Sequence, residues 1–313
     1  MATNLKQVAV VGGGLVGSGW AIVFARAGIP VRFFDANEDI RQTAPSCIRA
    51  SLSDMREFGL IDDVDIVAQR IDVVDSLVDA VAAADYVQES VFERLDVKKA
   101  VCAEIGAAIR DDAVVGSSSS GIPASIFTEH APRRSRFLIA HPVNPPHLVP
   151  LVELVPAPWT DPEIVPWLRA AMEQLGQVPI VVNREIEGFI LNRLQGALLN
   201  EAWALFDAGL ASVADIDRTI AHGLGLRWSF MGPFETIDLN APGGVEDYAQ
   251  RLGPLYHTIA EARRDPKPWS PEMIERVTAE RRAELPKQDL RARSAWRDRR
   301  LMAFVSHKQH QPI

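Results

Sequence analysis

The chain has 313 residues, of which 47% are hydrophobic and 24% charged, as in an ordinary globular protein, and this composition disfavours disorder, collagen and coiled coil. There are 33 Lys and Arg residues against 41 Asp and Glu, and the resulting net charge of -8 argues against a nucleic-acid-binding scaffold. Cys47 and Cys102 are far apart and belong to no CxxC pair, so the sequence favours a reducing cytoplasm and predicts neither a disulfide framework nor a metal site. No apolar run is long enough to span a membrane, and we expect no membrane partner.

The first 35 residues predict a strand, a helix and a second strand. Val8 to Gly12 is a short apolar run rich in β-branched residues, typical of a buried parallel strand. A helix-compatible stretch runs from Leu15 to about Ala27, where Gly28 ends it, and the strand Val31 to Asp35 follows. This is one βαβ unit.

Strand and helix patterns continue to alternate through the first half of the chain. Further strands are predicted at Ala84–Ser90, Val114–Ser120, Arg136–Val143, Leu151–Val155 and Pro179–Asn183, and helices at Glu38–Phe58, Leu95–Ala108 and Asp161–Leu175. Such alternation predicts an α/β fold with a doubly wound sheet. After about Arg184 the β-branched runs disappear and apolar residues recur at helical spacing. We therefore predict a first domain at residues 1–185 and an all-α C-terminal domain at residues 186–313, with a helical extension at its end.

The turn after the first strand carries a dinucleotide-binding pattern. Gly12, Gly14 and Gly17 form G-x-G-x-x-G, with Leu15 and Val16 inside the motif. The glycines permit a tight turn and close approach of the backbone to a pyrophosphate, which would sit at the helix N-terminus. A glycine motif alone is weak evidence, because an ordinary tight turn can have the same residues. Here a strand precedes it and a helix follows, which favours a Rossmann-type dinucleotide site.

Asp35 ends the second strand 18 residues after Gly17, where a carboxylate can accept hydrogen bonds from the adenosine ribose. A carboxylate there repels a 2′-phosphate, and the next residues, Ala36 and Asn37, include no Arg to receive one. The sequence therefore predicts NAD rather than NADP as the cofactor. Without the glycines, Asp35 would be interpreted as a solvated acid at a strand end.

Two polar residues stand in apolar strands beside the predicted crevice. His141 lies at the end of one strand, where an imidazole is well placed to exchange a proton with a substrate hydroxyl. Glu153 interrupts the apolar run LVPLVELVP, and a carboxylate among such neighbours needs a partner. Taken singly, His141 could equally be a buried, hydrogen-bonded residue and Glu153 could face outward.

The motifs together resemble those of the 3-hydroxyacyl-CoA dehydrogenase family. The resemblance runs from about Val8 to Asn240 through VVGGGLVGSGWA, QESVFERLDVKK, SSSSG, AHPVNPP, LVELVP, EIEGFILNRLQGALLNEAW and GPFET. Within the family the chain is most similar to the branch that contains lambda-crystallin and L-gulonate 3-dehydrogenase, on the basis of SSSS, GLGLRW, ETIDLNA and AWRD.

The resemblance implies roles for particular residues. His141 and Glu153 match a catalytic dyad, in which the imidazole takes the proton of a secondary alcohol while the carboxylate orients it. Ser120 and Asn192 match residues that form hydrogen bonds with the reacting oxygen. Two further matches, Glu93 and Lys98, imply contacts with the nicotinamide half of NAD, although both could be a solvated pair at a helix start. The family also implies a homodimer formed through the helical domain.

The substrate is predicted from charge. Members of the family that act on CoA thioesters need basic residues for the CoA phosphates, typically in the helical segment after the second strand. Here no Lys occurs between Lys6 and Lys98, and acids outnumber arginines from Glu38 to Asp65. Arg227 stands in a loop where CoA-type members usually have no Arg, and its guanidinium could hold a substrate carboxylate. It could instead be a surface residue paired with a neighbouring acid, Asp238 or Glu235.

These observations favour NAD-dependent oxidation of the 3-hydroxyl of a small hydroxy acid, with L-gulonate as the best single candidate. The alternatives are an (S)-3-hydroxyacyl-CoA dehydrogenase of fatty acid metabolism, an L-carnitine dehydrogenase, and a crystallin-like protein that has lost catalysis. L-carnitine would require an aromatic cage for its trimethylammonium group, and none is identifiable in a chain with 7% aromatic residues.

Overall fold

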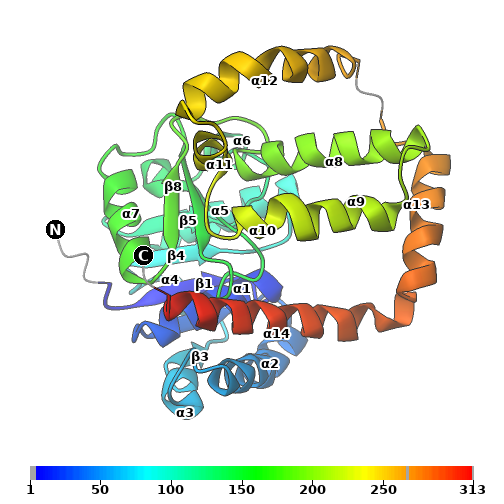
Figure 1. Ribbon diagram of the computed structural model, residues 1–313. Coiled ribbons are helices and arrows are strands. Elements are labelled where there is room, and N and C mark those ends of the chain that lie inside the picture. Colours follow the sequence, from blue (N-terminus) through cyan, green and yellow to red (C-terminus); the bar gives the residue numbers. More distant parts are fainter. Residues whose placement is uncertain (1–4, 266–267, 312–313) are drawn as a thin grey trace. The chain divides into compact units, whose positions relative to one another are not determined.

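The computed structural model describes residues 5–265 and 268–311. Within them one sheet has the strand order β3-β2-β1-β4-β5-β6-β7-β8 (Figure 1). The strands are β1 (Val8–Val11), β2 (Val31–Phe34), β3 (Ile71–Val73), β4 (Tyr86–Glu89), β5 (Val114–Ser117), β6 (Phe137–Pro142), β7 (Leu151–Pro156) and β8 (Val178–Val181). All neighbouring strands are parallel except β6 and β7, which are antiparallel.

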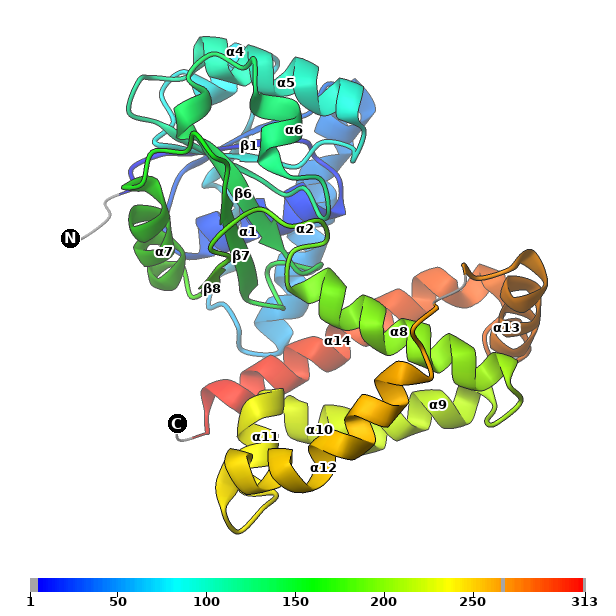
Figure 2. The same ribbon diagram turned by 90° about the horizontal axis from the view of Figure 1, so that it is seen from above.

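Helices cover both faces of this sheet. They are α1 (Leu15–Arg26), α2 (Glu38–Glu57), α3 (Val64–Ala68), α4 (Leu77–Val81), α5 (Leu95–Ala108), α6 (Ala124–Thr128) and α7 (Ile164–Gln174). In Figure 2, α4, α5 and α6 lie on one side of the sheet, and α1 and α7 lie on the other. The two apolar clusters of the core follow this division, because one draws on α1, α2 and α7 and the other on α4, α5 and α6. The predicted doubly wound α/β architecture is therefore confirmed.

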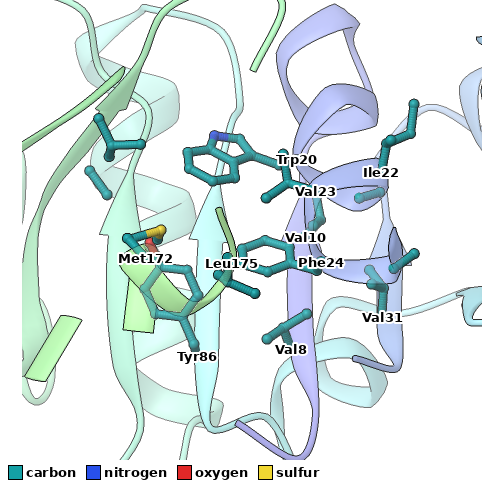
Figure 3. Packing of buried hydrophobic residues seen from close by; sticks show 14 of the residues in the cluster. Val8, Val10, Trp20, Ile22, Val23, Phe24, Val31, Tyr86, Met172 and Leu175 are labelled. Carbon is teal, nitrogen blue, oxygen red and sulfur yellow. The ribbon is translucent and has the colours of Figure 1, made fainter. Parts of the chain in front are cut away.

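The core on the α1 side packs aromatic rings against the central strands. Figure 3 shows Trp20 and Phe24 of α1 among the side chains of β1 and Tyr86 of β4. The rings of Trp20 and Phe24 stack with centroids 5.5 Å apart, and Phe24 meets Tyr86 edge-on at 5.9 Å. All three are fully buried, and a large apolar side chain contributes about 1.5–3 kcal/mol when it is fully buried. This packing fixes α1, and hence the turn before it, against the sheet.

The last helix, α14 (Leu290–Gln309), joins the same core. Met302 is 2% exposed within the cluster formed by α1, α2 and α7. Arg299 lies over the ring of Phe58 and bonds two acids at the end of α2, Asp54 at 3.0 Å and Glu57 at 2.5 Å. Contacts accordingly divide the chain into one unit of residues 1–193 with 293–313 and another of residues 194–292. The division after residue 193 lies eight residues beyond the predicted boundary at residue 185, and residues 293–313 belong to the sheet-containing unit rather than to the helical one.

The second unit is all-helical, as predicted. It contains most of α8 (Leu191–Asp207), then α9 (Val213–Thr219), a π-helical turn at Ile220–Leu224, α10 (Gly225–Trp228), α11 (Pro233–Leu239), α12 (Gly244–Glu261) and α13 (Pro271–Glu284). Trp203 stacks on Trp269 at 4.5 Å. In the described part of this unit, the buried side chains are few: Phe206, Thr236 and Ala241. A unit that buries so little within itself leaves much apolar surface to solvent.

Some short elements of the sheet-containing unit were not predicted from the sequence. The edge strand β3 was not predicted, and neither were α3, α4 and α6. Each has only three to five residues, too few to give a helical or strand period. In the described part of the chain, none of the helices combines the length and the apolar character that a membrane span requires.

Candidate active site

The glycine-rich turn between β1 and α1 has the geometry of a phosphate cradle. A Cβ at Gly12 would lie 2.5 Å from the backbone of Ser90, and one at Gly17 would lie 1.8 Å from the carbonyl oxygen of Gly12. Only glycine therefore fits these two positions. Gly14 is the N-cap of α1, no side chain caps the helix there, and a Cβ would meet no atom within 4 Å. Open space before the uncapped N-terminus of α1 is where a pyrophosphate can accept backbone N–H bonds.

The rest of the nucleotide turn agrees with this function. Leu15 is 81% exposed at the first position of α1, and Val16 is half-buried. Asp35 follows β2 and is half-buried, and its two carboxylate oxygens accept the N–H groups of Gly13, at 2.6 Å, and Asn37, at 2.7 Å. These bonds hold the carboxylate beside the glycine turn, and each oxygen keeps a second lone pair for a ribose hydroxyl. The residues present thus fit a dinucleotide.

A fully buried ion pair lies at the carboxyl end of β4. The Nζ of Lys98, in α5, lies 3.0 and 3.1 Å from the two carboxylate oxygens of Glu89, and both side chains have no exposed surface. Ser117 of β5 donates its hydroxyl to the same carboxylate. Glu89 and Ser117 were not predicted as site residues. The available signal was an acid at the end of the apolar strand that contains ADYVQES.

Glu93 organises the serine turn that follows β5. Its Oε1 accepts the hydroxyl of Ser119 at 2.6 Å and the N–H of Ser120 at 3.0 Å, and its Oε2 lies 3.8 Å from the Nζ of Lys98. The side-chain amide of Asn192 donates to the carbonyl oxygen of Ser120 at 2.5 Å. The structure therefore brings four of the predicted site residues together. The solvated-pair interpretation of Glu93 and Lys98 fails for Lys98, which is buried.

His141 and Glu153 are opposite one another on the antiparallel strands β6 and β7. Opposed residues of an antiparallel pair project from the same face of the sheet, and here the Nδ1 of His141 lies 2.7 Å from the Oε2 of Glu153. His141 is 6% exposed and Glu153 is fully buried. The outward-facing alternative for Glu153 is therefore wrong.

The second carboxylate oxygen of Glu153 has backbone partners. Its Oε1 accepts the N–H groups of Ile190 and Leu191, each at 2.9 Å. Burial raises the pKa of the Glu153 carboxyl, but the bonds from His141, Leu191 and Ile190 act in the opposite direction, and the net pKa lies below its usual range. Glu153 is thus held as an anion that can orient the imidazole.

A pocket of about 630 Å³ opens beside the serine turn. Its lining includes Glu93, Ser120, Ile122, Ile126, Glu187 and Gly188. The predicted carboxylate-binding residue, Arg227, belongs to the second unit, where it is exposed in α10. Its role in holding a substrate stays a prediction.

The sheet topology and the glycine turn define a nucleotide-binding dehydrogenase fold. Models of the 3-hydroxyacyl-CoA dehydrogenase family match the chain twice, as the NAD binding domain at residues 7–186 and as the C-terminal domain at residues 188–286. The chain belongs to this family, and it is an NAD-dependent oxidoreductase that acts on CH–OH groups. The sequence-based assignments of family, enzyme class and cofactor are confirmed.

Individual relatives refine the comparison. The chain is 36% identical to the lambda-crystallin homolog of Rattus norvegicus over 310 residues, which cover 97% of this chain and 96% of that protein. It is 38% identical to the L-carnitine dehydrogenase of Streptomyces coelicolor over 252 residues, covering 80% and 79% of the two chains. A solved structure of 5-formyl-3-hydroxy-2-methylpyridine 4-carboxylic acid 5-dehydrogenase, an NAD⁺-dependent dismutase, has a TM-score of 0.84 at 25% identity and covers 99% of this chain and 100% of its own.

Proposed function

We propose that the protein oxidises the 3-hydroxyl of a small free hydroxy acid, with His141 as the general base, and that L-gulonate is the first substrate to test. The observation that carries the mechanism is the buried contact between His141 and Glu153. NAD held at the glycine turn and Asp35 would supply the hydride acceptor for the oxidation of the carbinol carbon. His141 takes the hydroxyl proton, Glu153 stabilises the imidazolium that forms, and Ser120 and Asn192 position the alcohol oxygen.

A free acid is favoured over a CoA thioester because two of the three arginines of α2 face acids of the chain itself. Arg49 forms an ion pair with Asp65, and Arg41 lies 3.8 Å from Asp75. Guanidinium groups that already face carboxylates attract a polyphosphate weakly. The dehydrogenase with a TM-score of 0.84 is named for a carboxylic acid, which also supports this choice. Arg227 is our candidate for the substrate carboxylate.

L-carnitine is a second candidate, supported by a specific observation. The carboxylate residue Glu187 lines the pocket beside Ser120, and an anion attracts a quaternary ammonium group. The identity to an L-carnitine dehydrogenase points in the same direction. Assays with L-gulonate, L-carnitine and (S)-3-hydroxybutyryl-CoA in parallel separate the three possibilities. NADH formation with the thioester alone would contradict the free-acid proposal.

We further propose that residues 1–185 hold NAD, and that residues 186–313 contribute to substrate binding and form a homodimer. The exposed apolar side chains of the helical unit support dimerisation, among them Leu210, Leu226, Phe230, Phe234 and Leu255. Light scattering should give a mass near twice 34.4 kDa, and a clean monomer would refute the dimer. A cytoplasmic location, expected from the sequence, stays a prediction.

A further inference from the structure

The segment between β8 and α8 contains an unusual backbone turn. Gly188 has a φ of 75° and Phe189 a φ of 47°, so two successive residues are left-handed. Glycine adopts this conformation freely, whereas bulky residues rarely do. Among the described non-glycine residues, only Arg133 shares a positive φ with Phe189. Strained backbone persists where the surrounding packing holds it, and it is frequent at functional sites.

Packing around Phe189 holds the turn. Its side chain has no exposed surface and belongs to the core cluster on the α5 side of the sheet. Its ring centroid lies 5.8 Å from that of His141. The N–H of Phe189 donates to the carbonyl oxygen of Ile186 at 3.1 Å, which closes the turn. The buried ring thus anchors a left-handed residue directly beside the imidazole.

The turn determines the direction of the next two N–H groups. Those of Ile190 and Leu191 both reach the Oε1 of Glu153, at 2.9 Å each, while the Oε2 faces His141. The carboxylate is therefore held from one side by backbone and from the other by the imidazole. With Phe189 in a right-handed or extended conformation, the chain after it would take another direction and these two bonds could not both form.

We propose that the Gly188–Phe189 turn is a positioning element for the acid–base pair, which aims two backbone N–H groups at Glu153 and so fixes the carboxylate that orients His141. The inference rests on the proposed role of His141 as general base. Phe189 touches no reacting atom in this account, and it acts through Glu153.

The turn has a consequence for the pH dependence of the reaction. The two N–H groups stabilise the negative charge of Glu153. Without these hydrogen bonds the carboxylate is a stronger base, and it stabilises the imidazolium form of His141 more strongly. A higher pH is then needed to deprotonate the imidazolium of His141 and give the neutral imidazole that can abstract a proton. The acid limb of the pH profile of kcat/KM should therefore move to higher pH. A turn that serves stability alone would change the amount of active enzyme and leave the limb in place.

Gly188→Ala tests the turn without disturbing the core. A Cβ there would lie 3.6 Å from its nearest neighbours, in ordinary contact, so the substitution adds backbone strain and no clash. Gly176 is the matched control, because it has the same φ of 75° in the turn after α7 and a Cβ would meet nothing within 4 Å. Both variants should lose similar stability, since the strain is the same. We expect the acid limb to move upward in Gly188→Ala and to stay at the parent position in Gly176→Ala.

Substitution of the ring tests the anchor. Phe189→Ala should move the acid limb to higher pH and lower kcat about tenfold. Phe189→Leu keeps an apolar side chain in the core, so its acid limb and its kcat should both lie close to those of the parent. Binding of NADH, followed by its fluorescence, should match the parent in all four variants. Parent-like acid limbs in both Gly188→Ala and Phe189→Ala would overturn the proposal.

A second readout is independent of the substrate. Histidine labelled with ¹³C at Cε1 allows the His141–Glu153 pair to be titrated by NMR, with His141→Gln used to assign the signal. The pH at the midpoint of this titration should be higher in Gly188→Ala than in Gly176→Ala. If the parent turned over no hydroxy acid, the proposed function would fail while this titration still tested the turn. Equal midpoints in the two variants would refute the positioning role even in an active enzyme.

Discussion

The buried pair of Lys98 and Glu89 allows a quantitative prediction. Lys98→Met leaves the Glu89 carboxylate at a position with no exposed surface and without its cation. Glu89→Gln leaves the buried ammonium group with the more distant Glu93 carboxylate, 3.8 Å away. Removal of one partner of a buried ion pair costs about 3–5 kcal/mol, because the remaining charge keeps its desolvation penalty. Each single variant should therefore lose about this much free energy of unfolding.

The double variant distinguishes this reasoning from a simple loss of contacts. With Glu89→Gln and Lys98→Met together, no charge remains buried, so the stability should return to within about 1–2 kcal/mol of the parent. Urea unfolding at one fixed protein concentration, followed by circular dichroism, measures all four proteins. Two single losses that add in the double variant, or single losses below about 1 kcal/mol, would refute the account of the pair.

Three further predictions concern other parts of the chain. Burial, followed in importance by the charge of Arg26, lowers the pKa of His147 from 6.5 to about 4. The unfolded chain therefore binds more protons than the folded one below pH 6.5, and the free energy of unfolding should fall between pH 6.5 and 4, by about 2 kcal/mol at pH 5. In urea titrations, His147→Gln should make this dependence on pH less steep. Asp35→Ala removes a charged acceptor for the ribose and should raise the KM for NAD about 10- to 100-fold, and an unchanged KM would contradict the predicted nucleotide pose. Met302→Ala opens a cavity where α14 joins the core and should lower the free energy of unfolding by about 2–5 kcal/mol in the same assay. A decrease below about 0.5 kcal/mol, as for a surface substitution, would show that α14 is not docked there.

Much of the fold could be predicted because its strands are short, apolar and buried on both faces. The run VAVV of β1 is buried throughout, and so are β4 and β5, as expected for parallel strands between two layers of helices. The position of α14 could not be predicted. Its sequence is polar and Arg-rich, and the partners of Arg299 and the burial of Met302 identify its docking site.

The candidate site was predictable where a side chain carries the chemistry. His141, Glu153 and the glycines stand in recognisable motifs, and their geometry agrees with the interpretation. Two features gave no such signal. The bonds from Ile190 and Leu191 to Glu153 come from backbone N–H groups, which every sequence contains and only a specific turn directs. The register that places His141 opposite Glu153 depends on the geometry of the loop between β6 and β7, which residue types alone do not specify.

The most direct test of the central claim is NADH formation by the purified protein with NAD and L-gulonate, compared with the same assay on His141→Ala. L-carnitine and (S)-3-hydroxybutyryl-CoA serve as parallel substrates. We expect turnover of a free hydroxy acid by the parent, and a loss of at least about 100-fold in His141→Ala with NADH binding retained. Comparable turnover by the parent and by His141→Ala would contradict the assignment of His141 as the base.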